Sequence, residues 1–253
     1  MRSIPERILQ RIERRMKVTQ QGHLKSFASY LPYVQRKTGL EIGGPSDVFR
    51  KGSPVPVYEE AARVDNCDFS DSTTWSRHSQ TFLFNPAKPP GKTIVSEGSA
   101  LTEVADSSYD FVLSSHNLEH FANPVKALKE WQRVLKPSGA LVLVLPYYKN
   151  TFDHRRLPST VEHMLDDYKN MTGEDDLTHL PEILERHDLT KDLQAGSKEA
   201  FHKRSLENFS NRCLHHHVFD EKNSRNLLSA LSFKVLSIET FISPHILILA
   251  VTN

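Results

Sequence analysis

The sequence of 253 residues predicts an α/β fold with a doubly wound, mostly parallel sheet. Residues 38–46 join a short apolar run to an acidic residue and then to a glycine turn. Residues 109–115 and 140–145 are nearly continuous apolar runs, which are typical of strands buried on both faces of a parallel sheet. An amphipathic helix is expected between them, over residues 124–135. A strand, a helix and a strand in this order imply a right-handed parallel crossover.

Composition and charge exclude several classes of protein. Hydrophobic residues make up 38% of the chain and charged residues 25%, as in an ordinary globular protein. The 32 basic and 31 acidic residues leave a net charge of +1, so no bulk attraction for nucleic acid is expected. Cys67 and Cys213 lack metal-binding spacing and favour a reducing compartment. Because no apolar run could span a bilayer and the chain does not open on a signal peptide, we expect a cytoplasmic protein.

Residues 1–35 are expected to form an N-terminal helical segment. Within it, residues 4–18 place apolar side chains on one helical face and arginines on the opposite face. A basic amphipathic helix of this kind suits contact with a membrane surface or oligomerisation. The alternative, which we favour, is a helix packed on the domain with solvated arginines. The sequence leaves open whether the protein is a monomer or a homodimer.

The core expected over residues 36–146 begins with a strand that is followed by a sharp turn. Gly43 and Gly44 have no Cβ, so they permit this turn and also let a ligand approach the backbone closely. Glu41, at the carboxyl end of this strand, is expected to accept hydrogen bonds from the ligand. Asp65 follows 24 positions later, close to the spacing at which a second strand presents an acid to a ribose diol.

The second half of this core carries polar residues at a strand end. Residues 71–92 are expected to be irregular, and a third strand is expected over residues 93–100. The strand over residues 109–115 ends in His116-Asn117-Leu118-Glu119-His120. The carboxyl ends of central strands border the ligand crevice in open α/β sheets, so we expect residues that take part in a reaction at this strand end.

These segments closely resemble class I S-adenosylmethionine-dependent methyltransferases. The resemblance covers residues 38–146, resumes in the last strands, and is carried by Leu40-Glu41-Ile42-Gly43-Gly44, Asp65, Tyr109 to His120, Asn123-Pro124, Val134-Leu135-Lys136-Pro137-Ser138-Gly139 and Leu141 to Pro146. It implies a Rossmann-like sheet of seven strands with an antiparallel strand at its edge. It also implies S-adenosylmethionine as the cofactor.

The resemblance implies a cofactor site along the strand ends. Its expected members are Glu41, Gly43, Gly44 and Pro45 at the amino acid end, Asp65 at the ribose, Glu97, Gly98 and Ser99 at the adenine, and Ser115 and His116 beside them. Two features depart from the family pattern. Pro45 and Ser46 replace small residues of the glycine loop, and Ser99 or Ala100 stands where an aspartate commonly contacts the adenine amine.

Residues 147–219 lie outside the generic family core and are expected to form a mainly helical cap over the substrate, because methyl transfer must be shielded from water. Helical patterns run over residues 159–171 and 180–187. Residues 220–253 then supply a closing helix and two strands. The expected substrate-binding residues are Tyr147, Tyr148, Arg155, Arg156, His216 and His217.

The histidines are candidates for acid–base or metal chemistry. His116, His120 and His154 are each candidates for the general base, and His154 ranks first because Asp153 is expected to orient its ring. The alternative for each is a polar residue without a catalytic role. His154, His215 and His217 are also candidate ligands of Mg²⁺ or another divalent cation, and the alternative for the latter two is a hydrogen-bonded strand edge.

Three functions remain open. Methylases of nucleobase amines in this family carry Asn or Asp followed by Pro-Pro and an aromatic residue, whereas this chain has Ser115-His116-Asn117-Leu118. We therefore expect methylation of a hydroxyl on a small polar metabolite. The cap is loosely similar to bacterial sugar O-methyltransferases that act on methylated mannosides, which favours a carbohydrate. The alternatives are methylation of a protein or peptide, and a cofactor-binding scaffold without catalysis.

Overall fold

The computed structural model describes residues 17–20, 22–72, 80–241 and 244–252. In this part of the chain one sheet of eight strands forms, in the order β3-β4-β2-β1-β5-β6-β8-β7. The strands are β1 (Thr38–Ile42), β2 (Arg63–Asp68), β3 (Thr81–Phe82), β4 (Gly91–Val95), β5 (Tyr109–Ser115), β6 (Leu135–Pro146), β7 (Lys234–Phe241) and β8 (His245–Val251).

The sheet confirms the predicted fold class. Strands β4, β2, β1, β5 and β6 pair in parallel, whereas β8 is antiparallel to both of its neighbours, β6 and β7. The sheet has one strand more than expected, because the short β3 adds antiparallel to β4 at the opposite edge. Strand β8 itself lies one position in from the edge.

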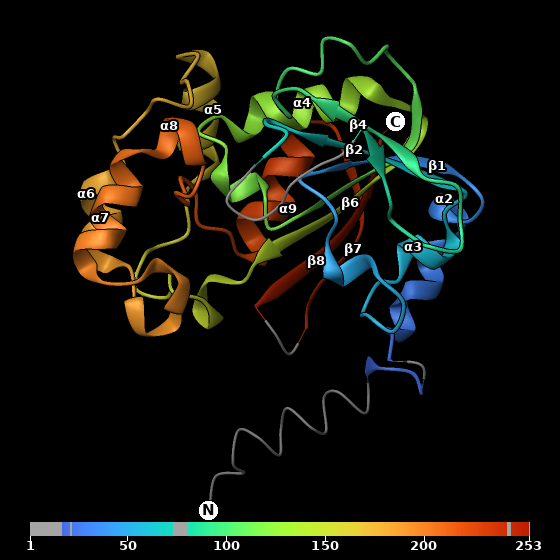
Figure 1. The fold of residues 1–253 in the computed structure, drawn as a ribbon, viewed down its shortest axis with the longest axis horizontal. Coiled ribbons are helices and arrows are strands. Elements are labelled where there is room, and N and C mark those ends of the chain that lie inside the picture. Colours follow the sequence, from blue (N-terminus) through green and yellow to red (C-terminus); the bar gives the residue numbers. More distant parts are fainter. Residues whose placement is uncertain (1–16, 21, 73–79, 242–243, 253) are drawn as a thin grey trace, which may run out of the picture.

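Helices cover both faces of the sheet (Figure 1). The described helices of these two layers are η1 (Lys25–Ser29), α2 (Leu31–Val34) and α3 (Val57–Glu60) on one face, and α4 (Pro124–Val134), α5 (Val161–Lys169) and α9 (Glu221–Ala230) on the other. The central strands are apolar on both sides because each side has a helical layer to cover. In β6, Leu141 and Leu143 pack toward α4 and α9, whereas Val142 and Val144 pack toward α2 and α3.

The connection from β5 to α4 positions the most polar strand end of the sheet. A 3-10 turn, η3 (Leu118–His120), follows β5, and Asn123 then caps α4 by accepting a hydrogen bond from the Lys126 amide at 3.0 Å. Trp131 anchors the helix, because its buried indole donates to the carbonyl oxygen of Gly98 at 2.8 Å. This contact fixes the turn after β4 against α4.

A helical segment separates β6 from α9. Besides α5 it contains η4 (Tyr148–Asn150), α6 (Leu180–Arg186), η5 (Leu189–Lys191), η6 (Leu193–Ala195), α7 (Lys198–Leu206) and α8 (Asn208–Asn211). Helices α6, α7 and α8 lie beside the sheet, at the left of Figure 1. They share a small apolar core of Leu180, Ile183, Ala195, Phe201 and Leu214. The helical patterns at 159–171 and 180–187 correspond to α5 and α6, whereas α7 has no apolar face that would have predicted it.

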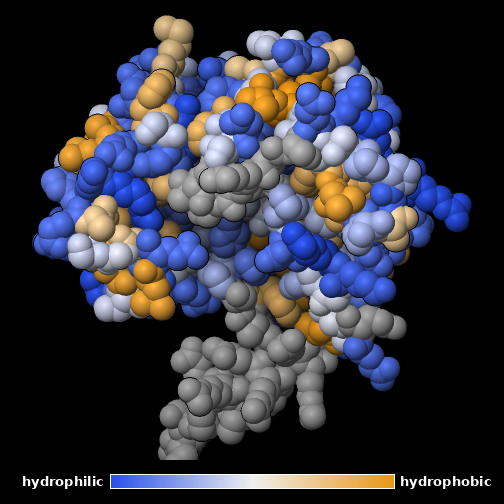
Figure 2. Space-filling view, viewed as in Figure 1, coloured by the Kyte–Doolittle hydropathy of each residue, from blue (hydrophilic) through white to orange (hydrophobic). Residues whose placement is uncertain are grey.

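The face of the molecule in Figure 2 is mostly hydrophilic, with apolar residues in smaller patches. Exposed apolar side chains among the described residues include Leu157 between η4 and α5, Met171 after α5 and Leu193 in η6. No helix among the described residues is both long enough and apolar enough to cross a membrane. The amphipathic helix expected over residues 4–18 lies outside the described residues except for Lys17 and Val18.

Candidate functional site

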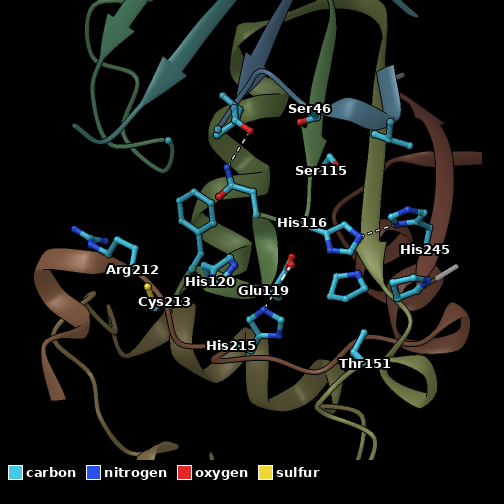
Figure 3. A pocket seen from close by; sticks show the side chains of 18 of the residues that line it. Ser46, Ser115, His116, Glu119, His120, Thr151, Arg212, Cys213, His215 and His245 are labelled. Atoms are coloured by element: carbon cyan, nitrogen blue, oxygen red, sulfur yellow. Dashed lines mark hydrogen bonds and ion pairs between the residues drawn. The ribbon is translucent and has the colours of Figure 1, made fainter. Parts of the chain in front are cut away.

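A cavity of about 850 Å³ opens at the carboxyl ends of the central strands, between the sheet and the helical segment (Figure 3). The core contributes the turns after β1, β2, β4 and β5, and the helical segment contributes residues around 150–152, 191–194 and 204–215. The residues that line the cavity include Gly43, Pro45, Ser46, Asp68, Glu97, Gly98, Ser115, His116, Glu119, His120, Thr151, Arg212, His215 and His245.

The turn after β1 needs glycine for steric reasons. Gly43 has a φ of +77°, which residues with a side chain rarely adopt, and a Cβ there would lie 2.2 Å from Nδ2 of Asn117. Asn117 uses that nitrogen to donate to the carbonyl oxygen of Ile42 at 2.9 Å. A Cβ on Gly44 would lie 2.4 Å from the carboxyl carbon of Glu41. The turn therefore presents bare backbone to the cavity at Gly43.

Glu41 supports this turn from behind and does not line the cavity, which corrects the expectation that it would contact a ligand. Its side chain is fully buried. The carboxylate accepts from the Ser46 hydroxyl at 2.7 Å, from the Ser46 amide at 3.1 Å and from the Tyr58 hydroxyl at 2.5 Å. Burial raises the pKa of Glu41 to about 7, although these donors act to lower it.

Asp68, and not Asp65, reaches the cavity from β2. Asp65 pairs with Leu40 in the middle of the sheet, and its carboxylate is held by Arg63, the Lys92 amide and the Tyr109 hydroxyl at 2.8 to 3.0 Å. It does not line the cavity. Strand β2 continues for three residues beyond Asp65 and ends at Asp68, which does line it. The structure thus places Asp65 away from the cavity, because the strand is longer than its apolar pattern indicated.

The turn after β4 places Glu97 and Gly98 in the cavity wall, whereas Ser99 is buried behind them and does not line it. Arg212 reaches across from the helical segment and forms ion pairs with Glu97 at 3.3 Å and with Glu174 at 3.0 Å. The sequence pattern did not single out this arginine. It joins the two walls of the cavity.

His116 is a weak base in this structure. Its Nε2 lies 2.7 Å from Nδ1 of His245, and burial, with smaller contributions from His245 and His215, lowers the pKa of His116 to about 3. His120 is half-buried: its Nδ1 lies 3.0 Å from the carbonyl oxygen of Leu214, and desolvation lowers its pKa well below the usual value. Neither ring is suited to hold a proton at neutral pH.

His215 and Asp153 form the best acid–base pair of the cavity. Nδ1 of His215 lies 2.6 Å from Oδ2 of Asp153, and the ring lines the cavity. Arg156 donates to Oδ1 of Asp153 at 3.0 Å and to the carbonyl oxygen of His215 at 2.8 Å. Burial opposes charge on both partners, yet their mutual attraction raises the pKa of His215 and helps to hold the pKa of Asp153 at about 2.

His154 does not fill the role predicted for it. Its Nε2 lies 2.8 Å from Asp188, and its ring does not line the cavity. The expectation that Asp153 orients a histidine ring applies to His215, 62 positions later in the chain, and not to the adjacent His154. Sequence adjacency could not reveal this, because the pair forms only when the helical segment folds.

Glu119 is a site residue that sequence reasoning left without a role. It lines the cavity wall although its side chain is fully buried, and neither carboxylate oxygen has a hydrogen-bond partner. Its Oε1 lies 3.9 Å from Nε2 of His215. Burial raises the pKa of Glu119 to about 7. Figure 3 shows Glu119, His120 and His215 turned toward one another.

The six residues predicted to bind substrate do not line the cavity. Tyr147 and Tyr148 contact each other edge to face, and Arg155 pairs with Asp188 at 3.3 Å. Arg156 is buried against Asp153, as described above. His216 contacts Asn208 at 3.1 Å, and His217 packs near Asp167. Chain position after β6 was a poor guide, because the segment turns away from the cavity before it returns at Asn150 to Phe152.

The predicted ligand set His154, His215 and His217 is not brought together. These histidines contact three different carboxylates, those of Asp188, Asp153 and Asp167. Two other groups of potential ligands do converge among the described residues: Glu119, His120 and His215 in the cavity, and His163, His179 and His217 outside it.

Comparison with known proteins identifies the fold. Residues 52–143 match the profile of a family described as "Methyltransferase domain". The structure is similar to that of a SAM-dependent methyltransferase from Aquifex aeolicus, with 12% identity, 100% of both chains covered and a TM-score of 0.50. It is also similar to that of an S-adenosylmethionine-dependent methyltransferase from Mesorhizobium loti, with 15% identity, 89% of this chain and 95% of that chain covered and a TM-score of 0.51. No curated protein sequence matched the chain. The chain therefore has the fold of S-adenosylmethionine-dependent methyltransferases.

Proposed function

We propose that this protein transfers the methyl group of S-adenosylmethionine to a hydroxyl oxygen of a small polar metabolite, with His215 as general base. The proposal starts from the fold and the methyltransferase domain of residues 52–143. It rests above all on one observation, the buried pair of Asp153 and His215, of which the imidazole lines the cavity. Methylation of a hydroxyl needs a group that takes its proton, and this pair suits that task.

The residues around the cavity fit the cofactor. Gly43 lines the cavity with backbone alone, and Pro45 and Ser46 continue the same wall. Asp68 ends β2 where a carboxylate can accept hydrogen bonds from two ribose hydroxyls. Glu97 and Gly98 border the side expected for the adenine. When bound, the cofactor supplies a methyl group on a positively charged sulfur.

Asp153 holds His215 in the tautomer that a base requires. A carboxylate only accepts hydrogen bonds, so Nδ1 of His215 must carry the hydrogen that is shared with Asp153. The lone pair is then on Nε2, which can take the proton of an acceptor hydroxyl. The imidazolium formed in this way is stabilised by Asp153, which stays ionised beside Arg156.

The helical segment supplies a polar wall for the acceptor. Its cavity-lining side chains include Asn150, Thr151, Lys191, Asp192, Gln194 and Arg204. Together these side chains offer both hydrogen-bond donors and acceptors. Such a wall suits a molecule with several hydroxyls, such as a sugar or a methylated mannoside. This segment also covers the cavity, which would limit the access of water to the methyl donor.

A divalent cation is a second way to activate the acceptor oxygen. Glu119, His120 and His215 offer ligand atoms that lie within 4.8 Å of one another, and Glu119 is buried without a hydrogen-bond partner. Two imidazoles and one carboxylate favour a transition metal over Mg²⁺, which prefers oxygen ligands. In that case activity would be lost on chelation and restored by added metal, whereas the base mechanism is insensitive to chelation.

The proposal is tested by methyl transfer from isotopically labelled S-adenosylmethionine to a panel of monosaccharides, methyl glycosides and peptides. We expect transfer to a hydroxylated small molecule, and a loss of about a hundred- to ten-thousandfold in His215→Gln with cofactor binding retained. Transfer only to peptides would favour the protein-directed alternative. Cofactor binding without transfer to any acceptor would favour a scaffold. Unchanged turnover in His215→Gln would rule out the assigned base.

A further inference from the structure

We propose that a zinc ion binds outside the cavity, between His163, His179 and His217, with Asp167 as the fourth ligand. His163 and Asp167 lie one turn apart on α5, His179 precedes α6, and His217 lies two residues beyond His215. None of the four lines the cavity. The site is therefore separate from the acid–base pair and does not depend on the function proposed above.

The ligand atoms of the three histidines lie within 4.8 Å of one another, and Asp167 adjoins those of His163 and His217. Nε2 of His163 lies 2.9 Å from Nε2 of His179 and 3.4 Å from Oδ2 of Asp167. Nε2 of His217 lies 3.6 Å from the same oxygen of Asp167. Ligands at the usual zinc distances of about 2.0 to 2.2 Å are about 3.3 to 3.5 Å apart in a tetrahedron.

Two of these groups each have a buried polar atom without a hydrogen-bond partner. Oδ2 of Asp167 is buried without a hydrogen-bond partner, and so is Nδ1 of His217, whose side chain is fully buried. The other oxygen of Asp167 accepts from the Thr172 hydroxyl at 3.1 Å, and Nε2 of His217 lies 3.3 Å from the carbonyl oxygen of Ala122. A buried polar atom without a partner is destabilising, and a cation bound by Asp167 would supply the partner that its Oδ2 lacks.

The ligand types select the ion. Three imidazoles and one carboxylate suit zinc, whereas Mg²⁺ and Ca²⁺ prefer sites built from oxygen. The half-buried His163 leaves a path to solvent. Bound zinc would tie α5, which packs on α4 and α9, to the start of α6 and to the segment of His215 to His217. The ion would thus fasten the helical segment to the core.

The test uses full-length protein without an affinity tag, stripped with a chelator and dialysed. Zinc uptake is measured by competition with a chromogenic chelator for the wild type, His163→Ala and His179→Ala. His215→Ala, which removes a member of the cavity group, is the matched control, and circular dichroism verifies that each variant is folded. We expect the His163→Ala and His179→Ala variants to lose one equivalent of zinc, with affinity reduced at least tenfold, and His215→Ala to retain that equivalent.

Thermal unfolding gives a second readout. Zinc should raise the unfolding midpoint of the wild type and of His215→Ala but not that of His163→Ala, because the ion binds only the folded site. No zinc uptake by the wild type would overturn the proposal. Equal uptake by the wild type, His163→Ala and His179→Ala would also overturn it, as would a loss confined to His215→Ala.

Discussion

Replacing Glu41 by glutamine tests how the glycine turn is held. The carboxyl group of Glu41 is fully buried and accepts hydrogen bonds from Ser46 and Tyr58. In the variant, the amide oxygen can accept from Ser46, and the amide nitrogen can donate to the Tyr58 hydroxyl. The substitution therefore removes a titrating group and keeps the shape of the turn.

The magnitude follows from the pKa. Burial raises the pKa of Glu41 to about 7 from an ordinary value of 4.5, so the folded state holds the proton more tightly than the unfolded state. The free energy of unfolding therefore falls as pH rises from about 4.5 to 7, by about 3 kcal/mol in all. Glutamine has no proton to lose. Relative to the wild type, Glu41→Gln should gain about 2 to 3 kcal/mol between about pH 5 and pH 8.

Urea unfolding at about pH 5, 6.5 and 8 measures this difference. Glu103→Gln is the control, because Glu103 is exposed, and its stability should follow that of the wild type at each pH. Parallel pH profiles for the wild type and Glu41→Gln would refute the reasoning, since they would mean that Glu41 titrates alike in the folded and unfolded chains.

Three further predictions concern the cavity and its supports. Asp153→Asn should lower turnover by about a hundred- to ten-thousandfold in the methyl-transfer assay, because an amide at this position no longer holds His215 in the required tautomer; cofactor affinity measured by calorimetry should not change. Gly43→Ala should cost about 1 to 3 kcal/mol in urea unfolding and weaken cofactor binding, because the residue has a φ of +77° and its Cβ would overlap Asn117; normal binding would contradict this. Trp131→Phe should cost about 1 to 3 kcal/mol, since it leaves the buried carbonyl oxygen of Gly98 without its donor; an unfolding midpoint equal to that of the wild type would refute it.

The sequence predicted well those elements whose pattern reflects burial alone. Strands β5 and β6 are apolar because helices cover both of their faces, and α4 has its cap at Asn123 and its anchor at Trp131. The end of β2 was harder to place. Asn66, Cys67 and Asp68 interrupt the apolar pattern, yet pairing with β1 and β4 continues through them. At about 3.3 Å per residue, an error of three residues moves the acid about 10 Å.

The candidate site depended on contacts between distant parts of the chain. The sequence marked both Asp153 and His215 as site residues, but their pairing requires the helical segment to fold back on itself. The polarity of a residue was also a poor guide to whether it lines the cavity. Arg156 carries a charge but is fully buried because it neutralises Asp153, whereas the cavity is lined by residues of α7 and of the turns before it. The hydrophobic periodicity of a sequence does not reveal buried ion pairs of this kind.

Calorimetric titration with S-adenosylmethionine tests the central claim most directly, using the wild type, Asp68→Ala and Asp65→Asn. We predict that the wild type binds one molecule per chain and that Asp68→Ala weakens binding at least tenfold, because Asp68 lines the cavity. Asp65→Asn should lower stability, through its contacts with Arg63 and Tyr109, but bind normally while folded. Failure of the folded wild type to bind, or loss of binding in Asp65→Asn with Asp68→Ala unaffected, would contradict the assigned cofactor site.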